Sequence, residues 1–201
     1  MWTWDPISRI VGLLTTGGWV VAVLMVVSVT MWTLILNRVL LFRQFSPGNM
    51  THEVASQFVF DQVLPDKKEF QGMTTEFVQK YVVLATPDSQ TNEAILDEVT
   101  MALVRSLDRY TALIGVLAAI APLLGLLGTV LGMITTFEVI SVFGTGNAQG
   151  MSRGISEALV TTEVGLLVAI PGLYMHHVLS RRGQKLKTQI ASLGVYLKRY
   201  V

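Results

Sequence analysis

The fold is decided by residues 110–137, YTALIGVLAAIAPLLGLLGTVLGMITTF, a stretch without one charged side chain. A helix needs about 20 apolar residues to cross the hydrocarbon core of a bilayer, so this stretch is long enough to span a membrane with some tilt. Residues 10–37 are also free of charge, and a third apolar segment, 155–180, holds Glu157 and Glu163 near its start. The sequence therefore predicts an all-α integral membrane protein with three transmembrane helices.

The composition excludes several classes of function. Charged residues make up 14% of the chain against about 25% in soluble proteins, and the formal net charge of +1 gives no basic field for nucleic acid. The absence of cysteine rules out disulfides, thiolate metal sites and cysteine nucleophiles. No nucleotide-binding, hydrolase or metalloprotease motif is present. We therefore expect neither an enzyme nor a metal site, and the chain must use a gradient, bind a partner, or both.

Lysine and arginine set the expected orientation. Arg38 and Arg43 follow the first span, Arg109 precedes the second, and Arg181 and Arg182 follow the third. By the positive-inside rule, these ends face the cytoplasm. The predicted segments are a periplasmic N-terminus (1–16), span one (17–37), a cytoplasmic helical segment (38–109), span two (110–137), a periplasmic loop (138–153), span three (154–180) and a cytoplasmic C-terminal helix (181–201).

The spans are expected to continue beyond the membrane. Apolar residues recur at helical spacing from about Thr91 and run into span two without proline or glycine, which predicts one helix leaving the membrane for the cytoplasm. Ile190, Leu193 and Leu197 predict the same continuation for span three. Between breaks at residues 46–48 and 86–88, periodic apolar positions indicate short amphipathic helices.

Two carboxylates lie inside span three. A charged side chain in a membrane span costs about 2.5–3.5 kcal/mol on insertion scales, which makes Glu157 a candidate functional residue, although a wet helix start would also tolerate it. With the turn between spans two and three centred near Phe143, Thr129 and Glu157 are expected at similar depth. Glu163 lies about 9 Å deeper and some 120° round the helix, so the two carboxylates do not share one face. A functional role and a protonated, hydrogen-bonded role remain equally open for Glu163.

Small residues form a stripe along span two. Gly125, Thr129, Gly132 and Thr136 recur every three or four residues, which favours close helix packing, and threonines at the depth of a carboxylate can also line an ion route. The residues expected to pack are Gly125, Gly128, Gly132, Gly165 and Ala169. Pro122 and Pro171 are expected to bend their helices.

Two runs in spans two and three resemble a known family. APLLGLLGTVLGMI (121–134) and GISEALVTT (154–162), followed by Gly165-Leu166 and Ala169-Ile170-Pro171, are similar to the signature of the ExbB/TolQ/MotA proton-channel family. The plan of three spans, an outer N-terminus and a large cytoplasmic segment resembles the ExbB/TolQ branch. The loop sequence VFGTG (142–146) looks closer to ExbB of TonB systems than to TolQ.

The resemblance implies a subunit of the bacterial inner membrane that forms a homo-oligomeric, typically pentameric ring. It implies an ExbD-like partner with one membrane helix and an essential aspartate, and a TonB-like protein that the proton motive force energises for import across the outer membrane. Besides surrounding membrane lipids, the only small molecules expected are the coupling proton and bound phospholipid.

The resemblance also suggests functional residues. By motif position, Glu157 matches the family's span-three glutamate, and Thr129 and Thr162 match its pore-lining threonines. Thr161 is a further candidate because it lies on nearly the same face of a regular helix as Glu157, whereas Thr162 lies about 140° away. Glu163 departs from the family pattern, which leaves open whether Glu157 is the only titratable group in the ring.

Two alternatives stay open at this point. A TolQ-like subunit would serve envelope integrity rather than nutrient import, and the identity of the partner separates the two. A non-conducting membrane scaffold would tolerate isosteric changes at Glu157 and Thr129. The sequence does not decide between H⁺ and Na⁺, or between rotation and a piston movement.

Overall fold

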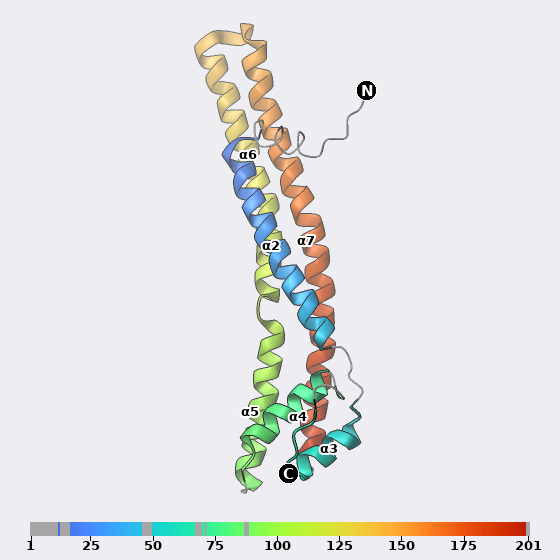
Figure 1. The fold of residues 1–201 in the computed structure, drawn as a ribbon. Coiled ribbons are helices and arrows are strands. Elements are labelled where there is room, and N and C mark those ends of the chain that lie inside the picture. Colours follow the sequence, from blue (N-terminus) through green and yellow to red (C-terminus); the bar gives the residue numbers. More distant parts are fainter. Residues whose placement is uncertain are drawn as a thin grey trace, which may run out of the picture. The chain divides into compact units, whose positions relative to one another are not determined.

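The structure, a computed structural model, describes residues 12, 17–45, 50–66, 70, 72–86 and 89–199, and all secondary-structure elements in this part of the chain are helices. Three helical stretches in this part of the chain are long and apolar enough to cross a membrane, Gly18–Arg43, Thr91–Gly146 and Ala148–Leu197. The prediction of an all-α protein with three spans is therefore confirmed at this level. The predicted N-terminal segment 1–16 falls outside the described residues, except for Gly12. The elements in order are α2 (Gly18–Gln44), α3 (His52–Phe60), α4 (Met73–Leu84), α5 (Ser89–Asp108), α6 (Thr111–Phe143), η1 (Gly144–Gly146) and α7 (Ala148–Leu197) (Figure 1).

The chain divides into two compact units. The first comprises Met1–Ile35 and Leu113–His176, and the second comprises Leu36–Ala112 and His177–Val201. In the first unit, α6 and α7 run antiparallel and are joined by η1, with α2 alongside them (Figure 1). The first unit therefore holds the main part of all three apolar helices.

The pairing of α6 with α7 depends on residues without bulky side chains. Gly125, Gly128 and Gly132 lie on the buried face of α6. A Cβ atom at Gly125 would be 3.0 Å from the Thr161 carbonyl oxygen, and one at Gly132 would be 2.7 Å from the Gly154 carbonyl oxygen. Such close backbone approach is how membrane helices gain packing contacts, because lipid supplies no hydrophobic force between them.

The turn between α6 and α7 is short, as the sequence VFGTGN (142–147) indicates. Helix α6 continues to Phe143 and α7 begins at Ala148, so both helices extend into the region 138–153 that we assigned to the periplasmic loop. The Asn147 side chain accepts a hydrogen bond from the Gly150 N–H at 3.0 Å and so caps the start of α7. Only η1 and Asn147 connect the two helices.

The second unit contains the short amphipathic helices that the sequence indicated. In this unit α4 packs against both α3 and α5. The Thr51 hydroxyl accepts from the Val54 N–H at 3.4 Å and caps α3. The Lys198 Nζ atom lies 2.7 Å from Asp97 Oδ2, which pairs the end of α7 with α5. The buried apolar side chains of this unit include Val59, Phe77, Val78, Tyr81, Leu96, Val99, Leu103, Leu107, Ile190, Leu193 and Leu197.

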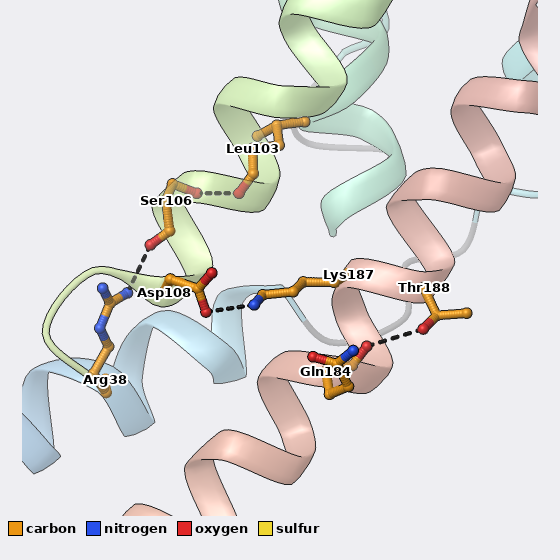
Figure 2. A network of polar contacts seen from close by, with 7 residues as sticks. All are labelled: Arg38, Leu103, Ser106, Asp108, Gln184, Lys187 and Thr188. Atoms are coloured by element: carbon orange, nitrogen blue, oxygen red, sulfur yellow. Dashed lines mark hydrogen bonds and ion pairs between the residues drawn. The ribbon is translucent and has the colours of Figure 1, made fainter. Parts of the chain in front are cut away.

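The helix that we expected to run unbroken into span two is interrupted at Arg109 and Tyr110. There α5 ends at Asp108, α6 begins at Thr111, and Tyr110 has φ +68°. In a continuous helix the Ser106 carbonyl would accept the N–H of Tyr110. Instead, the Ser106 carbonyl accepts a hydrogen bond from Nη1 of Arg38, with a donor–acceptor distance of 3.1 Å (Figure 2). The competing donor, a buried arginine from another helix, explains the break without any proline or glycine.

A second polar contact lies close to this junction. The Lys187 Nζ atom is 2.5 Å from Asp108 Oδ1, so the last residue of α5 is paired with α7 (Figure 2). The α7 helix itself is continuous from Ala148 to Leu197. Residues 181–197 thus belong to the same helix as the third apolar segment, whereas the residues before the second apolar segment form a separate helix.

Candidate functional site

Glu157 lies on α7 with its side chain half-buried against the start of α2. Its Oε1 atom is 2.5 Å from the position that a Cβ atom would occupy on Gly18. Gly18 is the first residue of α2 and has φ +61°, a conformation that glycine adopts without steric cost. The first N–H groups of a helix have no partner within it, and the helix dipole favours negative charge there. The start of α2 is therefore an electrostatically favourable place for this carboxylate.

Thr129 and Thr162 lie on the two helices that pack together, and both are half-buried. The Thr129 hydroxyl donates to the Leu126 carbonyl at 2.6 Å, within its own helix. The Thr162 hydroxyl donates across the interface to the Gly125 carbonyl at 3.3 Å. The hydroxyl proton of each threonine is therefore donated to a backbone carbonyl. The hydroxyl oxygen can still accept a hydrogen bond from another group.

The depth of Thr129 differs from the prediction. Gly128 packs against Thr161, and Gly132 packs against Ala158, which fixes the register of α6 and α7. Thr129 is thus level with Thr161 rather than with Glu157, a difference of four residues or about 6 Å along the helix. The assumed centre of the turn was too early in the sequence, because α6 runs on to Phe143.

Thr161 is buried between the two helices. Its side chain is 0% exposed, touches Gly128 and donates to the Ala158 carbonyl at 2.8 Å. The structure therefore places this candidate in the packing of α6 against α7 and not on a surface of the chain. Its proximity to Glu157 on a helical wheel came from the spacing alone, which cannot tell a lining face from a packing face.

Glu163 occupies the opposite side of α7 from α6. It is exposed and lies at the inner end of a groove of about 530 Å³. The other lining residues come from η1 and α7 and are Thr145, Ala148, Met151, Ser152, Ile155, Ser156, Leu159 and Val160. Glu157 and Glu163 are thus on different faces, one against α2 and one in this groove.

The remaining candidates lie in the body of the helix pair. A Cβ atom on Gly165 would be 2.9 Å from the Ala121 carbonyl oxygen, and Ala169 is buried. Pro122 and Pro171 lie inside α6 and α7, and both helices continue past them. Among the described residues, no group of three or more His, Asp or Glu side chains is placed to hold a metal ion.

Sequence reasoning missed two residues that shape the site and its boundary, Gly18 and Arg38. The doublet Gly17-Gly18 at the start of the first span was an available signal, since glycine often stands where the backbone must come close to another group. Nothing in the sequence pattern indicated that Arg38 would be buried, because an arginine at the end of a span usually reaches into the polar headgroup region.

The comparison with known families agrees with this architecture. Residues 67–192 match the MotA/TolQ/ExbB proton channel family. This chain belongs to that family. The matched range contains α6 and α7 up to residue 192, and with them Thr129, Thr162, Glu157 and Glu163. The protein is accordingly a multi-pass membrane protein of a proton-channel family.

Individual relatives carry names from two branches of the family. The chain is 44% identical over 85 residues to the putative biopolymer transport protein ExbB-like 3 of Synechocystis sp., covering 41% of this chain and 40% of that protein. It is 34% identical over 104 residues to the biopolymer transport protein ExbB of Pseudomonas putida, covering 51% of this chain and 32% of that one. It is also 34% identical over 79 residues to the Tol-Pal system protein TolQ of Haemophilus influenzae, covering 39% and 35%. The matches thus span well under half the length of these relatives.

Proposed function

We propose that this chain is an ExbB-like motor subunit that conducts protons with an ExbD-like partner and energises TonB-dependent import across the outer membrane. In this proposal the chain forms a ring of identical copies, typically five, in the bacterial inner membrane, among membrane lipids that include bound phospholipid. The N-terminus is periplasmic and the C-terminus cytoplasmic. The observation that carries the proposal is the Glu157 carboxylate, held half-buried against Gly18 in the stretch of α7 that matches the family.

The proposed path uses the oxygens of this region. Protons enter from the outer side, reach the aspartate of the single-span partner, and leave toward the cytoplasm past Glu157, Thr129 and Thr162. Protonation removes a charge that is expensive to keep in hydrocarbon, so each transfer lets the partner helix move relative to the ring. Thr162 follows Glu157 on α7, and Thr129 lies on α6 at the level of Thr161. Both threonines are therefore about 6 Å or more from the level of Glu157, measured along the helix axis toward the cytoplasmic side of the proposed path.

Two other functions have support of their own. The similarity to TolQ of Haemophilus influenzae favours a role in envelope integrity as the second candidate. The close glycine packing of α6 on α7 would equally suit a non-conducting scaffold. Only the proton-conducting proposals require the Glu157 carboxylate itself.

Partner identity is tested first. Native mass spectrometry of the affinity-purified protein, extracted gently from its own membrane, should find a ring of this chain with a few single-span, aspartate-bearing chains. A TonB-type partner set supports import, and a Tol-type set supports the second candidate. A lone monomer, or a complex with an unrelated permease or ATPase, would contradict both.

Conduction is tested on the same complex in proteoliposomes. Glu157→Gln should assemble normally and lose gradient-driven proton flux, because the amide keeps the shape of the side chain and cannot carry a proton as an acid. Glu138→Gln is the matched control, since Glu138 is exposed near the end of α6 and lies outside the proposed path. Full flux through Glu157→Gln would remove Glu157 from the proton path, and it would support a scaffold that holds partners while the protons cross elsewhere in the complex.

A further inference from the structure

One face of α7 in the first unit carries a groove that, among the described residues, is lined only by η1 and α7. The lining mixes apolar side chains with four polar ones. Thr145, Ser152, Ser156 and Glu163 all line the same groove. The last three are four and seven residues apart, which places them on one side of a helix. They form a line from the α6–α7 turn into the span, and Glu163 is its innermost member.

These polar side chains lie on the side of α7 that faces away from α6. The residues of α7 that pack on α6 include Ala158, Thr161 and Gly165. Glu163 lies two residues from both Thr161 and Gly165, or about 200° round the helix from each. This face is therefore not needed for the packing of α6 on α7.

The polar groups of this face are free to bind water. In the described part of the chain, Ser152, Ser156 and Glu163 have no hydrogen-bond or ion-pair partner. The threonines of the spans differ, since Thr129, Thr135 and Thr161 each donate to a carbonyl of their own helix. An engaged hydroxyl tolerates a lipid environment, whereas a free hydroxyl or a carboxylate in hydrocarbon costs several kcal/mol.

We propose that this groove is a water-filled half-channel from the α6–α7 turn to Glu163, and that Glu163 is a second proton-accepting carboxylate of the ring. A volume of about 530 Å³ has room for a chain of water molecules at about 30 Å³ each. At its inner end a hydronium ion gives its proton to a carboxylate oxygen of Glu163, leaving water and the neutral acid. Release of that proton restores the carboxylate. The inference rests on the proposed function, because a half-channel has a use only in a conducting chain.

Cysteine accessibility tests the water in the groove. The chain has no cysteine, so each introduced thiol is the only one in the chain. The test variant is Ser156→Cys, halfway along the groove. The control is Val23→Cys on α2, which is 37% exposed and stands level with Glu163, because Gly18 meets Glu157 and Met31 meets Gly172. Both are treated in the assembled complex with a charged, membrane-impermeant methanethiosulfonate, which reacts with the thiolate and hence with hydrated cysteine.

If the groove holds water, Ser156→Cys should react at least about tenfold faster than Val23→Cys. The thiol at residue 23 faces an apolar environment, where it stays protonated and therefore reacts slowly. Modification should then block proton flux through Ser156→Cys, measured against Val23→Cys treated in the same way. Equal, slow modification of the two variants would overturn the half-channel, and so would fast modification that leaves flux unchanged.

Glu163→Gln tests the end of the path. It should lower flux while Ser156→Cys in the same background still reacts quickly, because the groove remains wet and only its acceptor is lost. Unchanged flux in an assembled ring would overturn the role of Glu163. The unsubstituted complex separates this inference from the proposed function. If it conducts while Ser156→Cys stays unreactive, the half-channel fails alone. If it conducts no protons at all, the proposed function fails.

Discussion

The carboxylate of Glu157 lies directly against Gly18, a contact between residues 139 positions apart in the chain. It joins the carboxylate of the proposed proton path to the first turn of α2. The contact needs glycine for two separate reasons. A side chain at residue 18 would meet Glu157 Oε1, and the backbone there has φ +61°.

Substitution of two glycines, Gly18 and Gly144, separates the effect of the Glu157 contact from the effect of the left-handed backbone conformation. Gly18→Ala should destabilise the protein by more than the about 1–2 kcal/mol that a left-handed alanine costs. Gly144→Ala has the same backbone problem, at φ +68°, but a Cβ there has nothing within 4 Å. Thermal unfolding in detergent should show the larger loss for Gly18→Ala. Proton flux should fall only in that variant, because only there is Glu157 displaced. Equal losses in stability and flux would show that Glu157 does not rest on Gly18.

A second prediction concerns the packing of α6 on α7. In Gly128→Ala the new Cβ would overlap the Thr161 side chain, and overpacking of this kind costs about 1–3 kcal/mol. Gly146→Ala, whose Cβ would meet open space, is the control and should unfold at the same temperature as the unsubstituted protein. Adding Thr161→Gly to Gly128→Ala moves the small residue across the interface and should recover part of the loss. No recovery in the double variant would mean that the two residues are not in contact.

The sequence predicted those parts of the fold that depend on local composition. Stretches without charge located the three helices, and glycine spacing located the packing face of α6 at Gly125, Gly128 and Gly132. Both signals lie within a single helix, where spacing alone decides which residues share a face. Glu157 and Glu163 were singled out from composition, since a carboxylate inside an apolar segment is visible in the sequence, whereas Thr162 was named only through the family resemblance.

What the sequence did not predict depends on contacts between distant segments. The break at Tyr110 arises because Arg38 occupies the Ser106 carbonyl, 68 positions away. The burial of Thr161 depends on which face of α7 meets Gly128, and the depth of Thr129 depends on the length of α6 beyond residue 137. None of these has a signal in the spacing of one helix, so spacing placed Thr161 with Glu157 and Thr129 at the wrong level.

The break between α5 and α6 gives a third prediction. Arg38 is 1% exposed, and its guanidinium Cζ lies 5.4 Å from the centre of the Tyr110 ring. Arg38→Leu would release the Ser106 carbonyl to accept the Tyr110 N–H, so α5 and α6 should join. Hydrogen exchange of the Tyr110 amide should then slow by about tenfold or more, as its N–H becomes part of a helix. Arg43→Leu, at an exposed position of the same helix, is the control, and equal exchange in all three proteins would show that Arg38 does not hold the break open.

The last prediction concerns alkaline stability of the second unit. Tyr81 on α4 is 2% exposed, and burial raises the pKa of its phenol above the usual value of 10.0, because the phenolate is poorly solvated there. The folded form therefore binds the phenol proton more tightly than the unfolded chain does. The resulting stability is present in full below pH 10 and is lost as pH rises through the folded pKa. Tyr81→Phe should remove this loss, so that its helical circular dichroism falls less between about pH 10 and 12 than that of the unsubstituted protein. Tyr174→Phe controls for loss of a hydroxyl at an exposed position. An identical alkaline transition in all three proteins would show that Tyr81 does not contribute to it.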